Sequence, residues 1–107
     1  MKNKMLYELK FEAQFKRDYA QFKRQYPELM NDLLSAFDLL IKTGQVTEAY
    51  TPHLLNNKGG NYNNLLEFHL SDGKVDVLVI YKPHHTNPVI RFVRIGPHSQ
   101  LFQGKYH

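Results

Sequence analysis

The sequence contains no cysteine, no low-complexity run and no apolar segment long enough to cross a bilayer. The absence of cysteine excludes disulfides, thiolate zinc sites and thiol nucleophiles, and it fits a reducing compartment. The first residues, MKNKMLYELKF, lack the apolar core and cleavage site of a signal peptide. We therefore expect a cytoplasmic protein that does not enter a membrane.

What the chain does contain is typical of a folded domain. Hydrophobic residues make up 42% and aromatic residues 13% of the 107 residues, which argues against disorder. This length supports one hydrophobic core, so we expect a single domain over residues 1–107. Residues 1–4 add no recognisable element and are expected to form a flexible N-terminus, with translation starting at Met1 or Met5.

The formal net charge is +4, and the excess of cationic groups lies in the second half of the chain. Residues 1–50 hold eight Lys or Arg against seven Asp or Glu, whereas residues 51–107 hold six against three. All six histidines also lie in the second half: His53, His69, His84, His85, His98 and His107. This distribution favours a polyanionic partner bound by the second half, although ordinary charge scatter in a short chain gives the same pattern.

Two amphipathic helices are predicted in the first half. Aromatic residues recur at three- and four-residue steps from Phe11 to Tyr26, with basic residues between them. Pro27 ends this helix because proline disfavours helical geometry in the preceding residue, and it suits the first turn of a second helix. Gly44 is a suitable C-terminal cap for that second helix. The helical spacing favours a place in the core for the aromatic stripe over a stacking platform for bases.

Strand-like runs flank the two helices. A short strand is predicted over residues 6–11, and three more, LLEFHL, KVDVLVIY and PVIRFVRI, follow a loop over residues 51–63. The segments SDG and KPHHTN between them are typical of hairpin turns. The predicted fold is α+β, with the two N-terminal helices packed on one face of a small twisted antiparallel sheet.

The alternation of side chains along each strand predicts which residues share a face. Glu67 and His69 share one face of their strand. In the next strand, KVDVLVIY, Asp76 lies on the face opposite to that of the valines. In the last strand, Arg94 shares a face with Phe92. If the helices cover the valine face, Asp76 lies on the open face of the sheet, where His69 and Arg94 can join it.

Five residues in the second half have the chemistry that metal-free RNA cleavage requires: His53, His69, Asp76, Arg94 and His98. A base takes the proton of the ribose 2′-hydroxyl, a cation stabilises the phosphorane, and an acid protonates the leaving oxygen. Histidine suits acid or base because its ordinary pKa is about 6.5, and arginine fits phosphate oxygens with a planar fork. The carboxylate can orient a histidine or act as the base.

Each of these residues also has a structural interpretation. Taken alone, a strand-end arginine such as Arg94 is usually a solvated edge charge, and a turn histidine such as His98 is more often a capping or surface residue. For Asp76, a salt bridge to Lys74 or Arg94 explains the residue as well as catalysis does. His84 and His85 lie in a turn, and without cysteine or a spaced acidic set they predict no metal site. Composition and strand pattern alone therefore indicate a basic α+β domain that binds RNA.

The segments YTPHLL, LLEFHL, VDVLVIY and RFVRIGPHSQLF together resemble the RelE/YafQ-like toxins of bacterial type II toxin–antitoxin pairs, most closely the YafQ branch. The most specific part is Arg-x-Gly-x-His-x-x-Leu-Phe, which covers residues 94–102. The resemblance implies a fold similar to that of small microbial RNases. It also implies cleavage of mRNA in the ribosomal A site without a metal or other cofactor.

The resemblance assigns roles to individual residues. Arg94 would stabilise the phosphorane, and His98 would protonate the leaving group. Asp76, with His53 or His69, would supply the base. Phe102 would stack on a base of the codon. Further substrate contacts are expected from three cations, Lys58, Lys74 and Arg91.

The resemblance also implies partners: a DinJ/RelB-like antitoxin, the 70S ribosome with its mRNA, and operator DNA reached only through the antitoxin. Three positions depart from the family pattern: Val77 replaces a common tryptophan, Leu66 an arginine, and Pro97 a threonine or serine. The turn after His69 is also longer than usual. The alternatives are therefore a weak or inactive member that binds antitoxin or RNA without cutting, or a co-repressor acting with the antitoxin on the operator.

Overall fold

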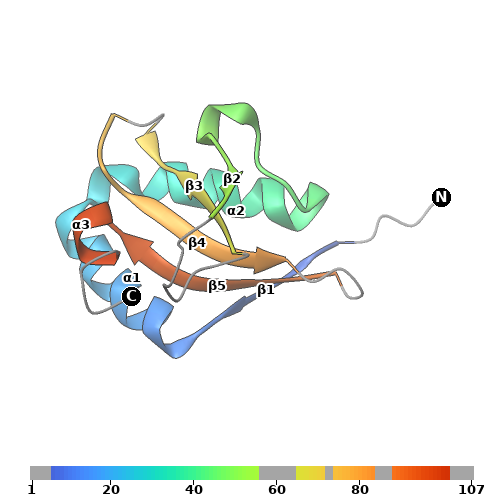
Figure 1. The fold of residues 1–107 in the computed structure, drawn as a ribbon, viewed down its shortest axis with the longest axis horizontal. Helices are drawn as coiled ribbons and strands as arrows, with labels where there is room; N and C mark the ends of the chain where they lie inside the picture. Colours follow the sequence, from blue (N-terminus) through green and yellow to red (C-terminus); the bar gives the residue numbers. More distant parts are fainter. Residues whose placement is uncertain (1–5, 56–64, 72–73, 84–87, 102–107) are drawn as a thin grey trace.

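The computed structural model of the chain describes residues 6–55, 65–71, 74–83 and 88–101 (Figure 1). Its helices are α1 (Ala13–Gln25), α2 (Met30–Thr43) and α3 (His98–Leu101), with 3-10 turns η1 (Pro27–Leu29) and η2 (Glu48–Tyr50). Its strands are β1 (Glu8–Phe11), β2 (His53–Leu54), β3 (Leu66–His69), β4 (Leu78–Pro83) and β5 (Val89–Gly96). Within the described residues, none of the helices has the length and apolarity needed to cross a membrane.

The five strands form one sheet in the order β1-β5-β4-β3-β2. Strands β2 to β5 pair antiparallel, as the predicted hairpins require, whereas β1 runs parallel to β5. Helices α1 and α2 lie on one face of this sheet (Figure 1). The predicted α+β fold with two helices on one face is confirmed, and the sheet is mixed because its first strand joins at the edge in parallel.

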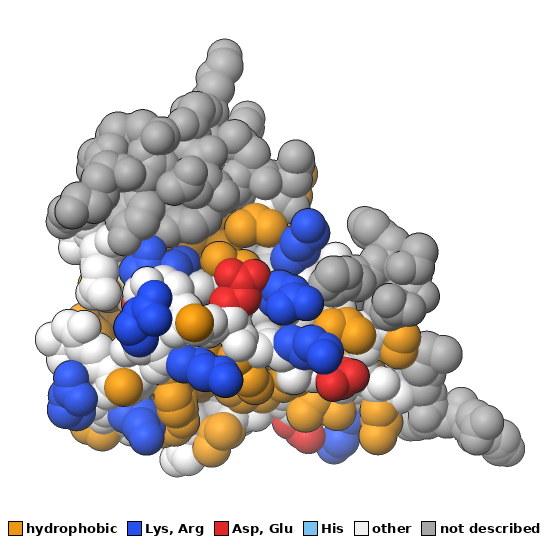
Figure 2. Space-filling model, turned by 90° about the horizontal axis from the view of Figure 1, so that it is seen from below, with side chains coloured by type: hydrophobic (Ala, Val, Ile, Leu, Met, Phe, Trp, Pro, Cys, Tyr) orange, Lys and Arg blue, Asp and Glu red, His pale blue; other side chains and the backbone are white. Residues whose placement is uncertain are grey.

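Helix α1 has one basic face and one apolar face, as its sequence period predicts. Its exposed side carries Lys16, Arg17, Lys23 and Arg24. Seen from below, where α1 and β1 lie in Figure 1, the surface shows many Lys and Arg side chains (Figure 2). Basic residues in the last turn also suit the negative end of the helix dipole.

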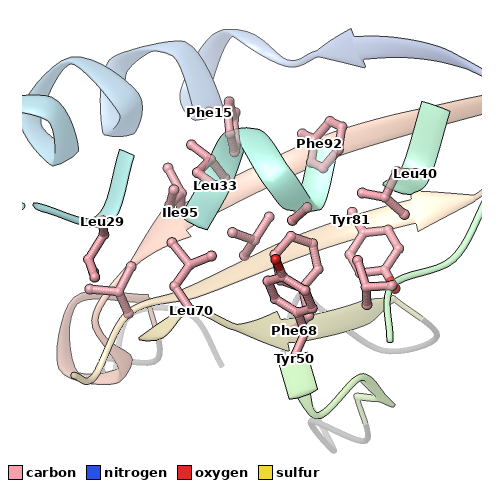
Figure 3. Packing of buried hydrophobic residues seen from close by; sticks show 14 of the residues in the cluster. Phe15, Leu29, Leu33, Leu40, Tyr50, Phe68, Leu70, Tyr81, Phe92 and Ile95 are labelled. Carbon is pink, nitrogen blue, oxygen red and sulfur yellow. The ribbon is translucent and has the colours of Figure 1, made fainter. Parts of the chain in front are cut away.

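The apolar sides of both helices meet the sheet in the main core (Figure 3). Phe15 from α1 and Leu33 from α2 are buried against Phe92 and Ile95 of β5. Burial of side chains of this size stabilises the fold by about 1.5–3 kcal/mol each. The helix boundaries also follow the prediction. Gly44 has a left-handed φ of 79°, and a Cβ there would lie 2.6 Å from the Cζ atom of Tyr7.

The opposite face of the sheet is the open face, and it carries the polar residues. A small second core, made of Leu78, Ile80 and Leu101, lies on this face. In the sheet register Glu67 faces Ile80, and Ile80 faces Arg94, so these three side chains share the open face. Glu67 and His69 pair with Ile80 and Leu78 of β4 without a register shift, so the predicted placement of Glu67 and His69 on one face is confirmed.

One face prediction was wrong, because β5 contains a bulge. Tyr81 lies opposite Phe92, while the preceding residue of β4, Ile80, lies opposite Arg94. Val93 is therefore an extra residue in β5, and the alternation of side chains shifts there. Strict alternation predicts that Phe92 and Arg94 share a face. In the structure Phe92 faces the helices, whereas Arg94 lies on the open face.

Two boundaries also differ from the sequence expectation. The third predicted strand, residues 74–81, begins only at Leu78, so Asp76 lies in the turn before β4. The predicted loop over residues 51–63 contains the short strand β2, whose His53 pairs with Glu67. Both differences bring polar side chains to the edge of the open face.

Candidate active site

Three histidine side chains from three separate elements lie in a row on the open face. The rings of His53 and His69 have centroids 5.8 Å apart, and those of His69 and His98 are 5.9 Å apart. His53 comes from β2, His69 ends β3, and His98 begins α3. The structure thus brings together three residues separated by up to 45 positions in the sequence.

Glu67 lies at one end of this row. Its Oε2 atom is 2.5 Å from Nε2 of His53 and 3.3 Å from Nε2 of His69. The Glu67 side chain is only 3% exposed, and its Oε1 atom has no hydrogen-bond partner within the described part of the chain. Because an unpaired polar atom is costly to bury, this carboxylate has a chemical environment that packing alone does not explain.

Asp76 lies at the other end of the row. Its Oδ1 atom is 2.7 Å from Nδ1 of His98, and its Oδ2 atom accepts a hydrogen bond of 3.1 Å from the His98 backbone N–H. The turn that carries Asp76 is fixed on both sides. The Val75 N–H donates to Ser71 Oγ over 2.8 Å, and Val77 is fully buried. The carboxylate therefore holds both the backbone and the ring of His98.

The turn between β5 and α3 sets the position of His98. Gly96 has a φ of 156°, which L-residues rarely adopt. Pro97 follows Gly96. The Pro97 carbonyl accepts hydrogen bonds from the N–H groups of Gln100 and Leu101, and these bonds form the first turn of α3. Pro97 has no N–H of its own, so it fits at the start of a helical turn. The departure at position 97 is thus compatible with the placement of His98.

Arg94 is buried and is held by an acidic residue of α1. Its Nε and Nη2 atoms lie 2.6 and 3.2 Å from Oδ2 and Oδ1 of Asp18. Gln14 donates to Oδ1 over 3.0 Å, and the Ile95 backbone N–H donates to Oδ2 over 3.2 Å. Strand β1 pairs with β5 only as far as Phe92, so Asp18 satisfies part of the β5 edge that β1 leaves uncovered.

Other predicted substrate contacts have different surroundings. Arg91 stands between Lys10 of β1 and Lys82 of β4 in the sheet register, forming a row of three cations on the open face. Like charges side by side on a sheet repel one another, so this row favours an anionic ligand. Lys74 is exposed in the turn that carries Asp76. Lys58 and Phe102, like the two turn histidines His84 and His85, lie outside the described residues.

Sequence reasoning did not assign a role to Asp18 or Glu67. A signal for Asp18 was present, because it lies three residues after Phe15 and four before Phe22, on the buried side of α1. For Glu67 the signal was its alternation with His69. Both signals show where a carboxylate lies, but neither identifies its partner.

A sequence model of the family described as "Bacterial toxin of type II toxin-antitoxin system, YafQ" matches residues 7–103. The chain belongs to this toxin family. No curated protein of similar sequence was found. Among solved structures, YafQ from Escherichia coli is 25% identical with a TM-score of 0.72, and the match covers 90% of this chain and 98% of that one. Its structure with DinJ is 26% identical with a TM-score of 0.69 and the same coverage.

Two solved structures of lower identity share the fold. A RelE–RelB complex from Pyrococcus horikoshii is 20% identical, with a TM-score of 0.65 over 90% of this chain and 99% of that one. A copper-bound mutant toxin from Helicobacter pylori is 22% identical, with a TM-score of 0.66 over 92% of this chain and 100% of that one. The resemblance to RelE/YafQ-like toxins inferred from the sequence is confirmed.

Proposed function

We propose that this toxin is an endoribonuclease that cuts mRNA in the ribosomal A site without a metal. The observation that carries the proposal is the row of three histidine rings between two carboxylates, with Arg94 on the same face of the sheet. In the reaction, the 2′-oxygen forms a bond to the adjacent phosphorus and the bond to the 5′-oxygen breaks. The products are a 2′,3′-cyclic phosphate and a 5′-hydroxyl.

His98 is the proposed general acid, and Asp76 is its positioning residue. The contact at Nδ1 orients the ring, so that Nε2 is the nitrogen that gives its proton to the departing 5′-oxygen. The sequence left open whether Asp76 orients a histidine or acts as the base. Its two contacts with His98 support the orienting role.

Glu67 is the proposed base, together with His53 and His69. Its Oε2 atom lies within reach of both imidazoles, so a proton taken from the 2′-hydroxyl by one histidine can be shared with the carboxylate. Burial keeps this carboxylate away from bulk water, which strengthens its electrostatic effect on the two rings. The base and the acid then lie at opposite ends of the histidine row, as an in-line displacement requires.

Arg94 is the proposed cation for the phosphorane, and Asp18 is the residue that holds it in place. A preorganised charge stabilises a transition state without reorganisation at the moment of reaction. Arg91 and its neighbours Lys10 and Lys82 would bind phosphates further along the RNA. Two contacts rest on the family resemblance alone: Phe102 stacked on a codon base, and Lys58 on a phosphate.

The proposed partners are a DinJ/RelB-like antitoxin and the 70S ribosome with its mRNA, and operator DNA through the antitoxin. The E. coli and P. horikoshii relatives were solved with DinJ and RelB, which supports an antitoxin partner. The exposed basic face of α1 supports an RNA partner larger than one codon (Figure 2). Action on ribosomes would place the protein in the cytoplasm.

The test is induced expression in cells with mapping of mRNA 5′ ends, for wild type against His98→Ala. We expect growth arrest and cuts at fixed codon positions for the wild type, and their loss in the variant, because general acids contribute about 10²–10⁴-fold in rate. His98 is about half exposed, so its removal should leave the fold intact. His84→Ala removes a histidine with no proposed role and should cut like the wild type.

Two results would contradict this function. Codon-specific cuts that persist in His98→Ala would show that another group is the acid. Absence of cuts in the wild type, with the antitoxin still bound, would favour the inactive binder or the operator co-repressor. In that case changes of the α1 cations should weaken operator binding, and changes of the histidines should not.

A further inference from the structure

The group of His53, Glu67 and His69 has the composition and geometry of a metal-ion site. One nitrogen from each imidazole and one carboxylate oxygen lie within 4.8 Å of one another. Both Nε2 atoms point toward the same oxygen of Glu67, at 2.5 and 3.3 Å. In a tetrahedral zinc site with bonds of about 2.0–2.2 Å, neighbouring ligand atoms stand about 3.3–3.6 Å apart. The contact of Glu67 with His69 already has this length, and the shorter contact with His53 would lengthen by about 1 Å when the ion enters.

The burial of Glu67 is the second observation. Its side chain is 97% buried, since only 3% is exposed, and its Oε1 atom has no hydrogen-bond partner within the described residues. A buried carboxylate is normally paired or bound to a metal. Both histidines contact Oε2, so Oε1 has no partner among the described residues. The positive charge of a bound cation would stabilise the negative charge that the two oxygens of the carboxylate share.

We propose that these three side chains bind one divalent ion of the Zn²⁺ class, and that the bound ion switches the nuclease off. Two imidazoles and one carboxylate suit Zn²⁺ or Cu²⁺ and not Mg²⁺, which prefers an all-oxygen octahedron. A fourth position remains for water. The binding part rests on geometry alone, and the inhibition rests on the proposed function, because the ion would occupy the groups that take the proton of the 2′-hydroxyl.

Access and selectivity follow from exposure. The side chains of His53 and His69 are 49% and 20% exposed, so an ion can reach their ring nitrogens from solvent. His98 is held by Asp76 at 2.7 Å and is not required as a ligand, although its ring lies beside His69. The ion therefore acts at the base end of the histidine row and leaves the acid end in place.

The binding test uses purified full-length chain titrated with ZnCl₂ by calorimetry, without RNA or ribosomes. We expect one ion per chain in the wild type and an affinity at least about tenfold lower in His53→Ala and in Glu67→Gln. The variant His84→Ala/His85→Ala/His107→Ala removes the three histidines outside the described residues and should keep the site. His98→Ala should also bind, and MgCl₂ should give no heat at this site. Circular dichroism checks that each variant is folded.

The inhibition test adds the same concentrations of ZnCl₂ to a ribosome-dependent cleavage assay. Wild-type cleavage should fall as the site fills and return when a Zn²⁺-selective chelator is added. Unchanged affinity in His53→Ala, or loss of binding in the triple histidine variant, would overturn the metal site. Stoichiometric binding without inhibition would overturn the switch. If no condition gives cleavage, the proposed function fails, and the titrations alone still decide the metal site.

Discussion

Two pairs, each joining a carboxylate to a basic side chain, fix the segment from the end of β5 to α3, and they differ in their contact with water. The side chains of Arg94 and Asp18 are 6% and 2% exposed, whereas those of His98 and Asp76 are 50% and 55% exposed. A buried pair with every oxygen hydrogen-bonded holds one geometry, whereas an exposed pair can move and exchange protons. The difference fits a cation that must stay in place beside an acid that must lose and regain a proton.

The largest effect is expected when the buried pair is broken. Asp18→Ala removes the carboxylate that pairs with the buried Arg94 charge, which should lower the free energy of unfolding by about 3–5 kcal/mol. Urea unfolding followed by circular dichroism measures this. Asp76→Ala is the matched control and should cost less than about 1 kcal/mol, because exposed pairs contribute little. Equal losses in the two variants would remove the distinction between the pairs.

A double variant separates the structural from the chemical part of the buried pair. Asp18→Leu/Arg94→Met replaces both charges by apolar side chains, which often preserves stability. We expect stability close to the wild type without RNA cleavage, because the proposed phosphorane cation is gone. Cleavage at the wild-type rate in this stable variant would exclude Arg94 from the reaction.

The effect of the exposed pair should appear in the rate and not in stability. Asp76→Asn keeps the shape of the side chain but cannot accept equally from the His98 ring and backbone at both oxygens. We expect cleavage at saturating ribosomes to fall by about tenfold or more, up to the 10²–10⁴ that a general acid contributes. The free energy of unfolding should change by less than about 1 kcal/mol. A rate unaffected by Asp76→Asn would mean that His98 does not depend on this carboxylate.

The same contrast explains how much of the molecule the sequence predicts. The positions of Phe15, Phe22 and Gly44 followed from local rules, because helix period and cap geometry depend on neighbouring residues. The pairing of Asp18 with Arg94 joins residues 76 positions apart, and no local pattern identifies the partner of a buried carboxylate. Side-chain chemistry suggested the candidate residues of the site and the family resemblance assigned their roles, whereas the contacts that hold them came only from the structure.

The bulge at Val93 shows why face predictions fail at such a site. Alternation along a strand holds only while each residue faces one partner, and one extra residue reverses every later side chain. Ile80 lies opposite Arg94 because of this shift, so the arginine leaves the helix-covered face on which Phe92 lies. At Asp76 the strand boundary was wrong and not the face, since this residue lies in the turn before β4 and next to His98.

The smallest effect at neutral pH is expected from Tyr81, a titratable group that is 3% exposed on the helix-covered side of β4. Burial raises the pKa of Tyr81 to about 12 from its ordinary value of 10. The folded protein therefore holds the phenol proton more tightly than the unfolded chain does. This part of the stability is present below pH 10 and is lost as the pH rises from about 10 through 12.

Tyr81→Phe should change the free energy of unfolding by no more than about 1 kcal/mol at pH 7 and should flatten its decline above pH 10. Urea midpoints measured from pH 7 to 11 test this. Tyr50→Phe is the comparison, since the pKa of Tyr50 is also raised, first by burial and then by Asp32. An alkaline decline of equal slope in wild type and Tyr81→Phe would show that Tyr81 ionises equally easily in the folded and unfolded chains. The core between the sheet and the helices would then be accessible to water, and the contrast between the dry, helix-covered face of the sheet and its solvated open face would be lost.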